Sequence, residues 1–217
     1  HLMLRESEVY LHNLREQLGV KRSEIRAGGK AAHTFTLESG QHVVLTESNL
    51  MELYTLSRRE QALKHIFGGG IKINVTSDHA VKGRQTLHYK VTQNDVSQML
   101  SKLSDKQKAF ARGMQEFLSK NAAAWGNAAM MDMYGYSPFG EENYWPVVVS
   151  HAGKPAQDPE QSRMFNALLN SSFTKPTMYQ ASNPLIIGDA MQTYTEHVTG
   201  MAAVAGMAAP IQDAMKL

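Results

Sequence analysis

Apolar residues recur at intervals of three and four positions over most of the chain, a spacing typical of helices that bury one face. The longest periodic segment follows Ser104, where Phe110, Met114, Phe117 and Trp125 fall on one side of a helix. Helices are predicted in this way over residues 3–18, 47–67, 93–103, 105–134, 160–170, 184–206 and 210–217. The pattern therefore predicts a mainly helical protein.

Two parts of the chain instead alternate between apolar and polar residues, which is typical of β-hairpins. They are residues 33–37 with 42–45, and residues 71–75 with 86–91. A glycine, Gly40, lies in the turn of the first pair, and a further short strand is predicted over residues 147–149. The fold class that follows is α+β and predominantly helical, with five to seven helices and one or two small β-hairpins.

The order of these elements also predicts a division of the chain. Residues 1–44 hold the N-terminal helix and the start of the first hairpin, which could form a separate small unit, and residues 45–217 hold the helical domain. A chain of 217 residues can form one domain or two small ones. Its last residues continue a helical pattern, so we expect a longer parent protein.

Residues 53–67 are predicted to form one uninterrupted helix with an unusual polar stripe. At 100° per residue, Tyr54, Arg58, Gln61 and His65 fall at positions i, i+4, i+7 and i+11 of that helix. Three glycines, 68–70, are expected to end the helix because glycine adopts the positive φ angle that a helix stop requires. A phosphate-binding loop is not expected there, since the glycines follow a helix and no Gly-Lys-Ser/Thr is present.

Several helix starts can be predicted from capping residues. Thr46 can cap the helix that follows it, and Thr92-x-x-Asp95 and Ser104-x-x-Gln107 have the pattern of capping boxes. Asn183 followed by Pro184 predicts another start, with asparagine as the cap and proline at the first helical position.

Composition and charge exclude some classes of protein. No apolar run approaches the roughly 20 residues of a membrane span, no secretion signal is visible, and cysteine is absent. The first 112 residues carry 17 Lys and Arg against 11 Asp and Glu, whereas the remainder carries 5 against 9. A basic half is a mild indication of an anionic partner. The nucleic-acid-binding candidates are Arg58, Arg59, Lys64, Lys102, Lys106, Lys108 and Arg112, although solvated helix faces carry such residues routinely.

The motifs of common enzymes and metal sites are absent. There is no His-Glu-x-x-His and no Gly-x-Ser-x-Gly, and Asp78, His79 and His88 lack a fourth ligand of evident spacing. Glu141 and Glu142 are adjacent on an extended segment, so their side chains should point apart rather than form an acid–base pair. We therefore expect no catalytic residue, no metal and no cofactor.

Three blocks of sequence stand out beyond these motifs. They are Leu53-Tyr-x-Leu-Ser-Arg-Arg-Glu-Gln-Ala with His65-x-x-Gly-Gly-Gly-Ile71; Tyr134-Gly-Tyr-x-x-Phe-x-Glu-Glu-Asn-Tyr-Trp-Pro146; and Phe173-Thr-Lys with Asn183-Pro184, Asp189, His197-Val, Met201, Pro210 and Asp213-Ala-Met-Lys216. Together they resemble a polyvalent-protein-associated domain of the large polyvalent and minor structural proteins of phages, prophages and conjugative elements. The resemblance covers about residues 45–217.

The resemblance implies a non-catalytic structural or interaction module of a phage or mobile-element multidomain protein. Such a module would lie in the bacterial cytoplasm or the phage virion, with the other domains of its parent protein, and DNA, as its partners. We expect the polar residues of the blocks to form one buried or partly buried network: Tyr54, Arg58, Gln61, His65, Glu142, Asn143, Asn183, Asp189 and His197. The oligomeric state and the source element stay open.

Two alternatives remain at this point. One is a nucleic-acid-binding module that contacts the DNA phosphate backbone through the basic residues of the N-terminal half. The other is an enzyme with a His/carboxylate site formed by Arg58, His65, Glu142 and His197, which requires these four side chains to converge in a pocket.

Overall fold

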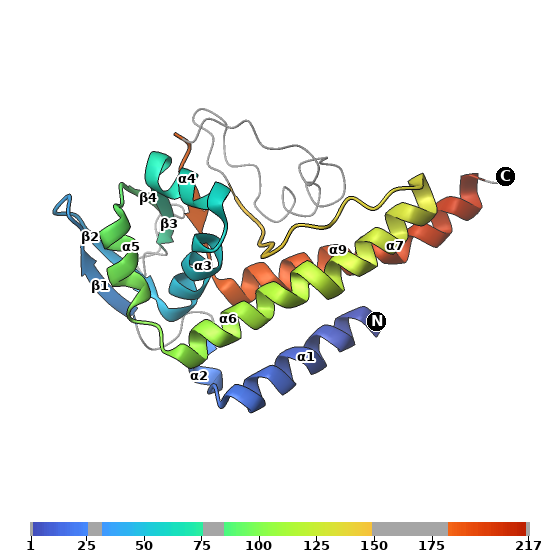
Figure 1. Ribbon diagram of the computed structural model, residues 1–217, viewed down its shortest axis with the longest axis horizontal. Helices are drawn as coiled ribbons and strands as arrows, with labels where there is room; N and C mark the ends of the chain where they lie inside the picture. The colour runs from blue at the N-terminus through green and yellow to red at the C-terminus, as the bar shows by residue number, and fades with distance from the viewer. Residues whose placement is uncertain (1, 26–31, 76–84, 149–181, 216–217) are drawn as a thin grey trace.

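A computed structural model describes residues 2–25, 32–75, 85–148 and 182–215, and it has the predicted α+β, predominantly helical fold (Figure 1). The helices are α1 (Leu2–Leu18), α2 (Arg22–Ile25), α3 (Glu47–Ser57), α4 (Glu60–Gly69), α5 (Gln93–Leu100), α6 (Asp105–Phe117), the π-helical turn η1 (Leu118–Ala122), α7 (Ala123–Tyr134) and α9 (Ala190–Met215). The strands are β1 (Ala32–Thr36), β2 (His42–Thr46), β3 (Ile71–Val75), β4 (Gln85–Tyr89) and β5 (Leu185–Ile187).

Long helices form one side of the molecule. The α6, η1 and α7 segments are continuous, and α9 runs beside them in the same direction while α1 packs on α6 from another side (Figure 1). Gly126 of α7 leaves room for the side chains of Met201 and Phe139, since a Cβ there would lie 2.3 Å from Cε of Met201 and 2.6 Å from Cε2 of Phe139. The predicted helix over residues 105–134 is thus confirmed, with one π-helical turn inside it.

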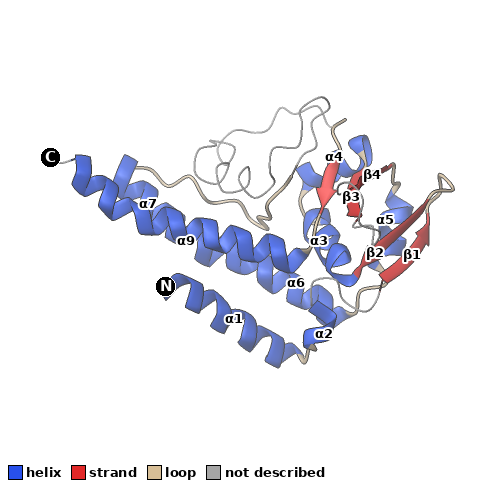
Figure 2. Cartoon of the chain, turned by 180° about the vertical axis from the view of Figure 1, so that it is seen from behind, coloured by secondary structure: helices blue, strands red, loops and turns tan. Residues whose placement is uncertain are grey.

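The strands lie together at the other end, beside α3, α4 and α5 (Figure 2). The β1 and β2 strands form the first predicted hairpin, with Phe35 opposite Val43. The β3 and β4 strands form the second antiparallel pair, and β5 adds to β3 in parallel, with Ile71 opposite Leu185. The loop between β3 and β4, which holds Asp78 and His79, lies outside the described residues.

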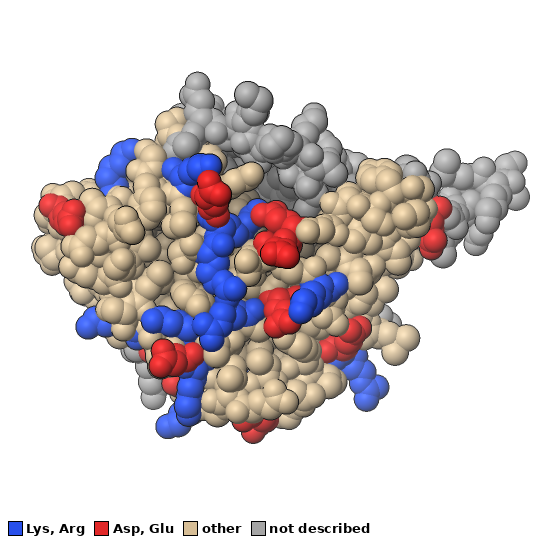
Figure 3. Space-filling model, viewed as in Figure 1, with Lys and Arg blue, Asp and Glu red and all other residues tan. Residues whose placement is uncertain are grey.

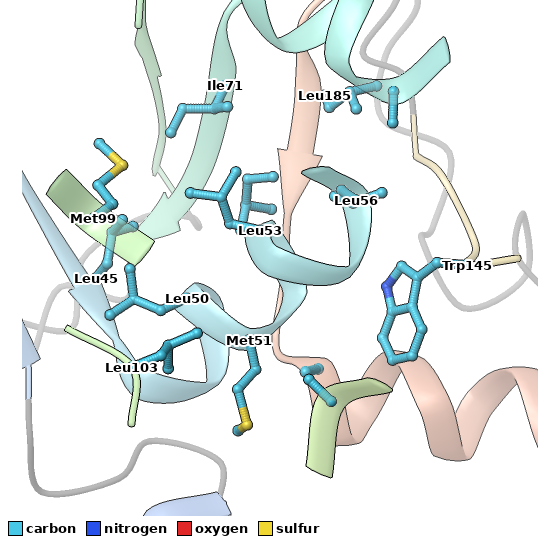
Figure 4. Packing of buried hydrophobic residues seen from close by; sticks show 14 of the residues in the cluster. Leu45, Leu50, Met51, Leu53, Leu56, Ile71, Met99, Leu103, Trp145 and Leu185 are labelled. Carbon is cyan, nitrogen blue, oxygen red and sulfur yellow. The ribbon is translucent and has the colours of Figure 1, made fainter. Parts of the chain in front are cut away.

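One hydrophobic core joins both parts of the predicted division at residue 45. Val20, Phe35 and Val43 from the first part belong to the same buried cluster as α3 and the long helices. Figure 4 shows α3 at its centre, with side chains from β2, β3, α5 and β5 packed around that helix. The buried residues labelled in Figure 4 are Leu45, Leu50, Met51, Leu53, Leu56, Ile71, Met99, Leu103, Trp145 and Leu185.

The prediction of one helix over residues 47–67 is wrong, because the chain breaks at the two arginines. Helix α3 ends at Ser57, and Arg59 has an extended backbone (φ −110°, ψ 120°) before α4 begins. The Ser57 hydroxyl donates to the carbonyl of Tyr54 at 2.7 Å, a local bond that competes with helix continuation. The stripe from Tyr54 to His65 therefore does not exist as one helix face.

The predicted caps have mixed outcomes. Capping boxes are confirmed at Thr92 and Ser104, and Thr46 also forms one, with Asn49. The helix start at Asn183 is wrong: the apolar run that follows pairs with β3 as β5, and α9 begins only at Ala190. The caps are therefore predicted correctly wherever no strand competes for the residues that follow them.

Three further predictions concern the second half of the chain. Helix α9 continues through position 210 to Met215, so a separate last helix is wrong. Residues 147 and 148 form no strand, although the Val148 carbonyl accepts a bond from the amide of Ile186 at 2.9 Å. The helix predicted over residues 160–170 lies outside the described residues.

Candidate functional site

The break between α3 and α4 places Arg58 against the segment that follows α7. Its Nη2 donates to Oδ1 of Asn143 at 2.8 Å, and Asn143 adopts the left-handed conformation (φ 54°) that asparagine tolerates better than most residues. Gln115 of α6 completes the junction, since its amide nitrogen donates to the carbonyls of both Thr55 and Asn143. Three segments distant in sequence thus meet at Arg58.

The neighbouring Arg59 fixes the same segment from the other side. Its guanidinium donates to Oε1 of Glu141 from Nε at 2.9 Å and from Nη2, and to the carbonyl of Trp145 from Nη1. It also lies 5.5 Å from the centre of the Tyr144 ring, within cation–π range. Because the side chain of Trp145 is fully buried, these bonds hold the segment down on the core.

His197 of α9 packs on this segment from below. Its ring lies 5.1 Å from that of Tyr144, and the amide of Tyr144 donates to the hydroxyl of Ser119 in η1 at 2.8 Å. Burial lowers the pKa of His197 to about 4, and burial raises the pKa of Tyr144. Both side chains are therefore uncharged near neutral pH.

A small cavity opens beside these rings, with an empty volume of about 360 Å³ including solvent at its mouth. Ser119, Phe139, Glu141, Tyr144 and His197 are among its lining residues. Of the four residues that the enzyme alternative requires to converge, only His197 lines this cavity.

The glycine triplet forms a second junction, between α4 and the start of β5. The Nδ1 atom of His65 lies 3.0 Å from the carbonyl oxygen of Asn183. On the opposite side, Nε2 of His88 lies 2.7 Å from the carbonyl of Gly69, and the ammonium of Lys90 donates to the carbonyl of Gly68 at 3.0 Å. The helix end is therefore held by side chains from two directions.

The other sequence candidates lie elsewhere. Tyr54 accepts a bond from Nη1 of Arg112 at 3.1 Å, while Gln61 and Glu142 are exposed. Asp189 caps α9, because its Oδ1 accepts from the amide of Gln192 at 3.0 Å. Hydrogen bonds join two pairs of these candidates across distant segments, Arg58 with Asn143 and His65 with Asn183.

Several residues of these junctions were not among the sequence candidates. Gln115 and Ser119 lie on a helix whose polar face is indistinguishable in sequence from a solvated one. The sequence does single out Glu52, because it is a carboxylate between Met51 and Leu53 on an apolar helix. It is buried, and its Oε2 accepts from the hydroxyl of Thr193 at 2.9 Å.

The basic candidates differ in what they contact. Arg58 and Arg59 are bonded within the fold, and Lys64 pairs with Glu60 at 2.8 Å. No ion pair in the described ranges involves the remaining four, which are Lys102, Lys106, Lys108 and Arg112. Figure 3 shows Lys and Arg side chains in a band that crosses α4, the α3–α4 junction and α6.

Among the described residues, no three His, Asp or Glu side chains are grouped so as to hold a metal ion. None of the helices that the structure describes is both long and apolar enough to cross a membrane.

The chain was also compared with known proteins. No protein-family model, no curated protein and no solved structure matches it.

Proposed function

We propose that this chain is a non-catalytic structural or interaction module of a phage or mobile-element multidomain protein. One observation supports the proposal: the three sequence blocks contact one another through their own residues. Arg58 of the first block bonds to Asn143 of the second, and His65 of the first lies 3.0 Å from the carbonyl of Asn183 in the third. The second and third blocks meet where the Tyr144 and His197 rings pack.

These contacts give Arg58, Asn143 and His65 a structural role that needs no substrate. A polar side chain that joins two segments stabilises the fold, because its loss leaves a buried partner group unsatisfied at a cost of about 1–3 kcal/mol. Residues of an active site behave differently, since replacing them often leaves stability unchanged or raises it. Stability measurements can therefore distinguish a structural role from a catalytic one.

A double-mutant cycle on Arg58 and Asn143 tests the structural role. Urea unfolding of Arg58→Ala, Asn143→Ala and the double variant should give a coupling energy of about 0.5–3 kcal/mol. Gln61→Ala is the matched control: the residue lies in the same block, is exposed, and should change stability by less than about 0.5 kcal/mol. A coupling energy near zero, or variants more stable than the original, would contradict the proposal.

The assignment to a mobile element has a test of its own. The sequence of the parent protein should contain methylase, helicase, nuclease or peptidase segments beside this domain, as in the family that the blocks resemble. A parent chain in which this domain lies among unrelated metabolic enzymes would refute the assignment and leave the structural role untouched.

A further inference from the structure

Positively charged side chains gather where α6 meets the α3–α4 region (Figure 3). Helix α6 contributes Lys108 and Arg112, the α3–α4 region contributes Arg58, Arg59 and Lys64, and the bond from Arg112 to Tyr54 joins the two regions. We call these five residues the basic band. Of the acidic residues around it, Glu60, Glu141 and Glu116 are paired with Lys64, Arg59 and Lys120 respectively, and Asp105 precedes Lys108 by one turn of α6.

Only part of the basic band can contact a partner. Arg59 is engaged by Glu141 and Trp145, and Arg58 has an Nη1 atom that is buried without a hydrogen-bond acceptor. Arg58 therefore adds positive charge to the surface but cannot place that atom on a ligand. Lys64 is paired with Glu60, so Lys108 and Arg112 remain, and neither belongs to an ion pair in the described ranges.

The geometry of these two residues suits a phosphate backbone. They are four residues apart on α6, so they lie on the same face about 6 Å apart along the helix axis. Arg112 is exposed, and its Nη1 donates to the hydroxyl of Tyr54, which leaves its other nitrogen atoms for a second acceptor. Duplex DNA carries about one negative charge per 1.7 Å of its axis, so it can meet both cations at once.

We infer that the basic band binds the phosphate backbone of duplex DNA, with Lys108 and Arg112 as the contacting residues. Arg58 strengthens the binding through its charge. The contacts reach phosphates and no base, so the binding is independent of sequence. This inference rests on the proposed role as an interaction module and names the partner.

A variant pair with matched charge tests the inference. Lys108→Gln/Arg112→Gln removes two positive charges from the basic band, and Lys102→Gln/Lys106→Gln removes two from outside it. Lys106 leaves α6 about 200° around the helix from Lys108, and its ammonium lies beside Gly19 at the end of α1. The two double variants have the same net charge, so only the position of the lost charges differs.

Gel-shift titration on a random-sequence DNA duplex, repeated from about 50 to 200 mM salt, supplies the readout. The full chain should bind, and the Lys108/Arg112 variant should lose about 0.9 from the salt slope for each lost contact, or roughly 2 in total. The Lys102/Lys106 variant should keep the original slope. Tyr54→Phe removes the bond to Arg112 without changing charge, and should keep the slope as well.

Two outcomes would overturn the inference. The first is no shift of duplex DNA by the full chain at about 50 mM salt. The second is an equal loss of slope in both double variants, which would mean that net charge rather than the basic band governs binding. Either outcome leaves the coupling between Arg58 and Asn143 intact, so it can be distinguished from failure of the structural role.

Discussion

Gly69 packs directly against the peptide of Asn183: a Cβ at Gly69 would lie 2.3 Å from the carbonyl carbon of Asn183 and 2.6 Å from the nitrogen of Pro184. The chain that leads into β5 can therefore approach the end of α4 only where a side chain is absent. His65 reaches the same carbonyl group from the preceding turn. The glycine triplet is thus a packing site as well as a helix stop.

Gly69→Ala should destabilise the protein by about 2 kcal/mol or more, because backbone atoms rather than a flexible side chain meet the added methyl group. Gly140→Ala is the control: a Cβ there meets nothing within 4 Å and the position has no positive φ angle, so its effect should stay within about 0.5 kcal/mol. Urea unfolding of both variants measures the difference. Equal stabilities would show that the close approach at Gly69 is unimportant.

The sequence predicts the local features of this fold better than its long-range ones. Capping boxes at Thr92 and Ser104 follow from residues three apart, and they are present as predicted. The glycine stop was also predicted, but the reason for Gly69 lies in Asn183, which is more than a hundred residues away. No pattern within one helix can show such a contact.

The errors have the same origin. Arg58 and Arg59 are good helix formers, yet α3 ends at Ser57, and the guanidinium groups of the two arginines bond to Asn143 and Glu141 in a distant segment. The start of β5 resembles a helix start, but pairing with β3 takes precedence over the local preference. Tertiary contacts outweighed propensity in both places, and the candidate site is built on the first of them.

Because His197 is buried and uncharged, we expect the protein to lose stability in mild acid. Burial gives the folded state a pKa of about 4, below the unfolded value of 6.5, so the unfolded chain binds the proton more readily. The stabilisation is complete above pH 6.5 and is lost as the pH falls toward 4. At pH 5 the free energy of unfolding should be lower than at pH 7 by about 2 kcal/mol.

Urea unfolding at pH 7 and pH 5 measures this difference, and His197→Phe provides the comparison because it keeps a ring against Tyr144 and removes the titrating group. The variant should lose less stability than the original chain over this interval. If both chains lose the same amount, another group is responsible for the acid sensitivity.

Arg59 should contribute more to stability than its ion pair with Glu141 alone. Glu141 is half exposed (51%), so the pair contributes at most about 1 kcal/mol after screening by solvent. The bond from Nη1 to the carbonyl of Trp145 is more protected, and a hydrogen bond from a charged donor contributes about 1.5–3 kcal/mol. Arg59→Ala should therefore cost roughly 2–4 kcal/mol, whereas Glu141→Gln should cost about 0.5 kcal/mol.

Arg59→Lys separates charge from geometry, because lysine keeps the charge but cannot bond to Glu141 and Trp145 with a planar fork. Its stability in urea unfolding should fall closer to that of Arg59→Ala than to that of the original chain. A lysine variant as stable as the original would mean that charge alone holds the segment.

The capping boxes of α5 and α6 should each contribute about 1 kcal/mol to stability. The hydroxyl of Thr92 accepts from the amide of Asp95 at 3.1 Å, and that of Ser104 accepts from the amide of Gln107 at 3.2 Å. Thr92→Ala and Ser104→Ala remove these acceptors, so that only water can bond to the amides of Asp95 and Gln107. Ser97→Ala, inside α5 and exposed, removes a hydroxyl that only bonds back to the carbonyl of Gln93 and should change stability by less than about 0.5 kcal/mol. Because the two caps lie on different helices and share no partner, their effects should add in the double variant, and a strongly non-additive result would show that the two caps are energetically coupled.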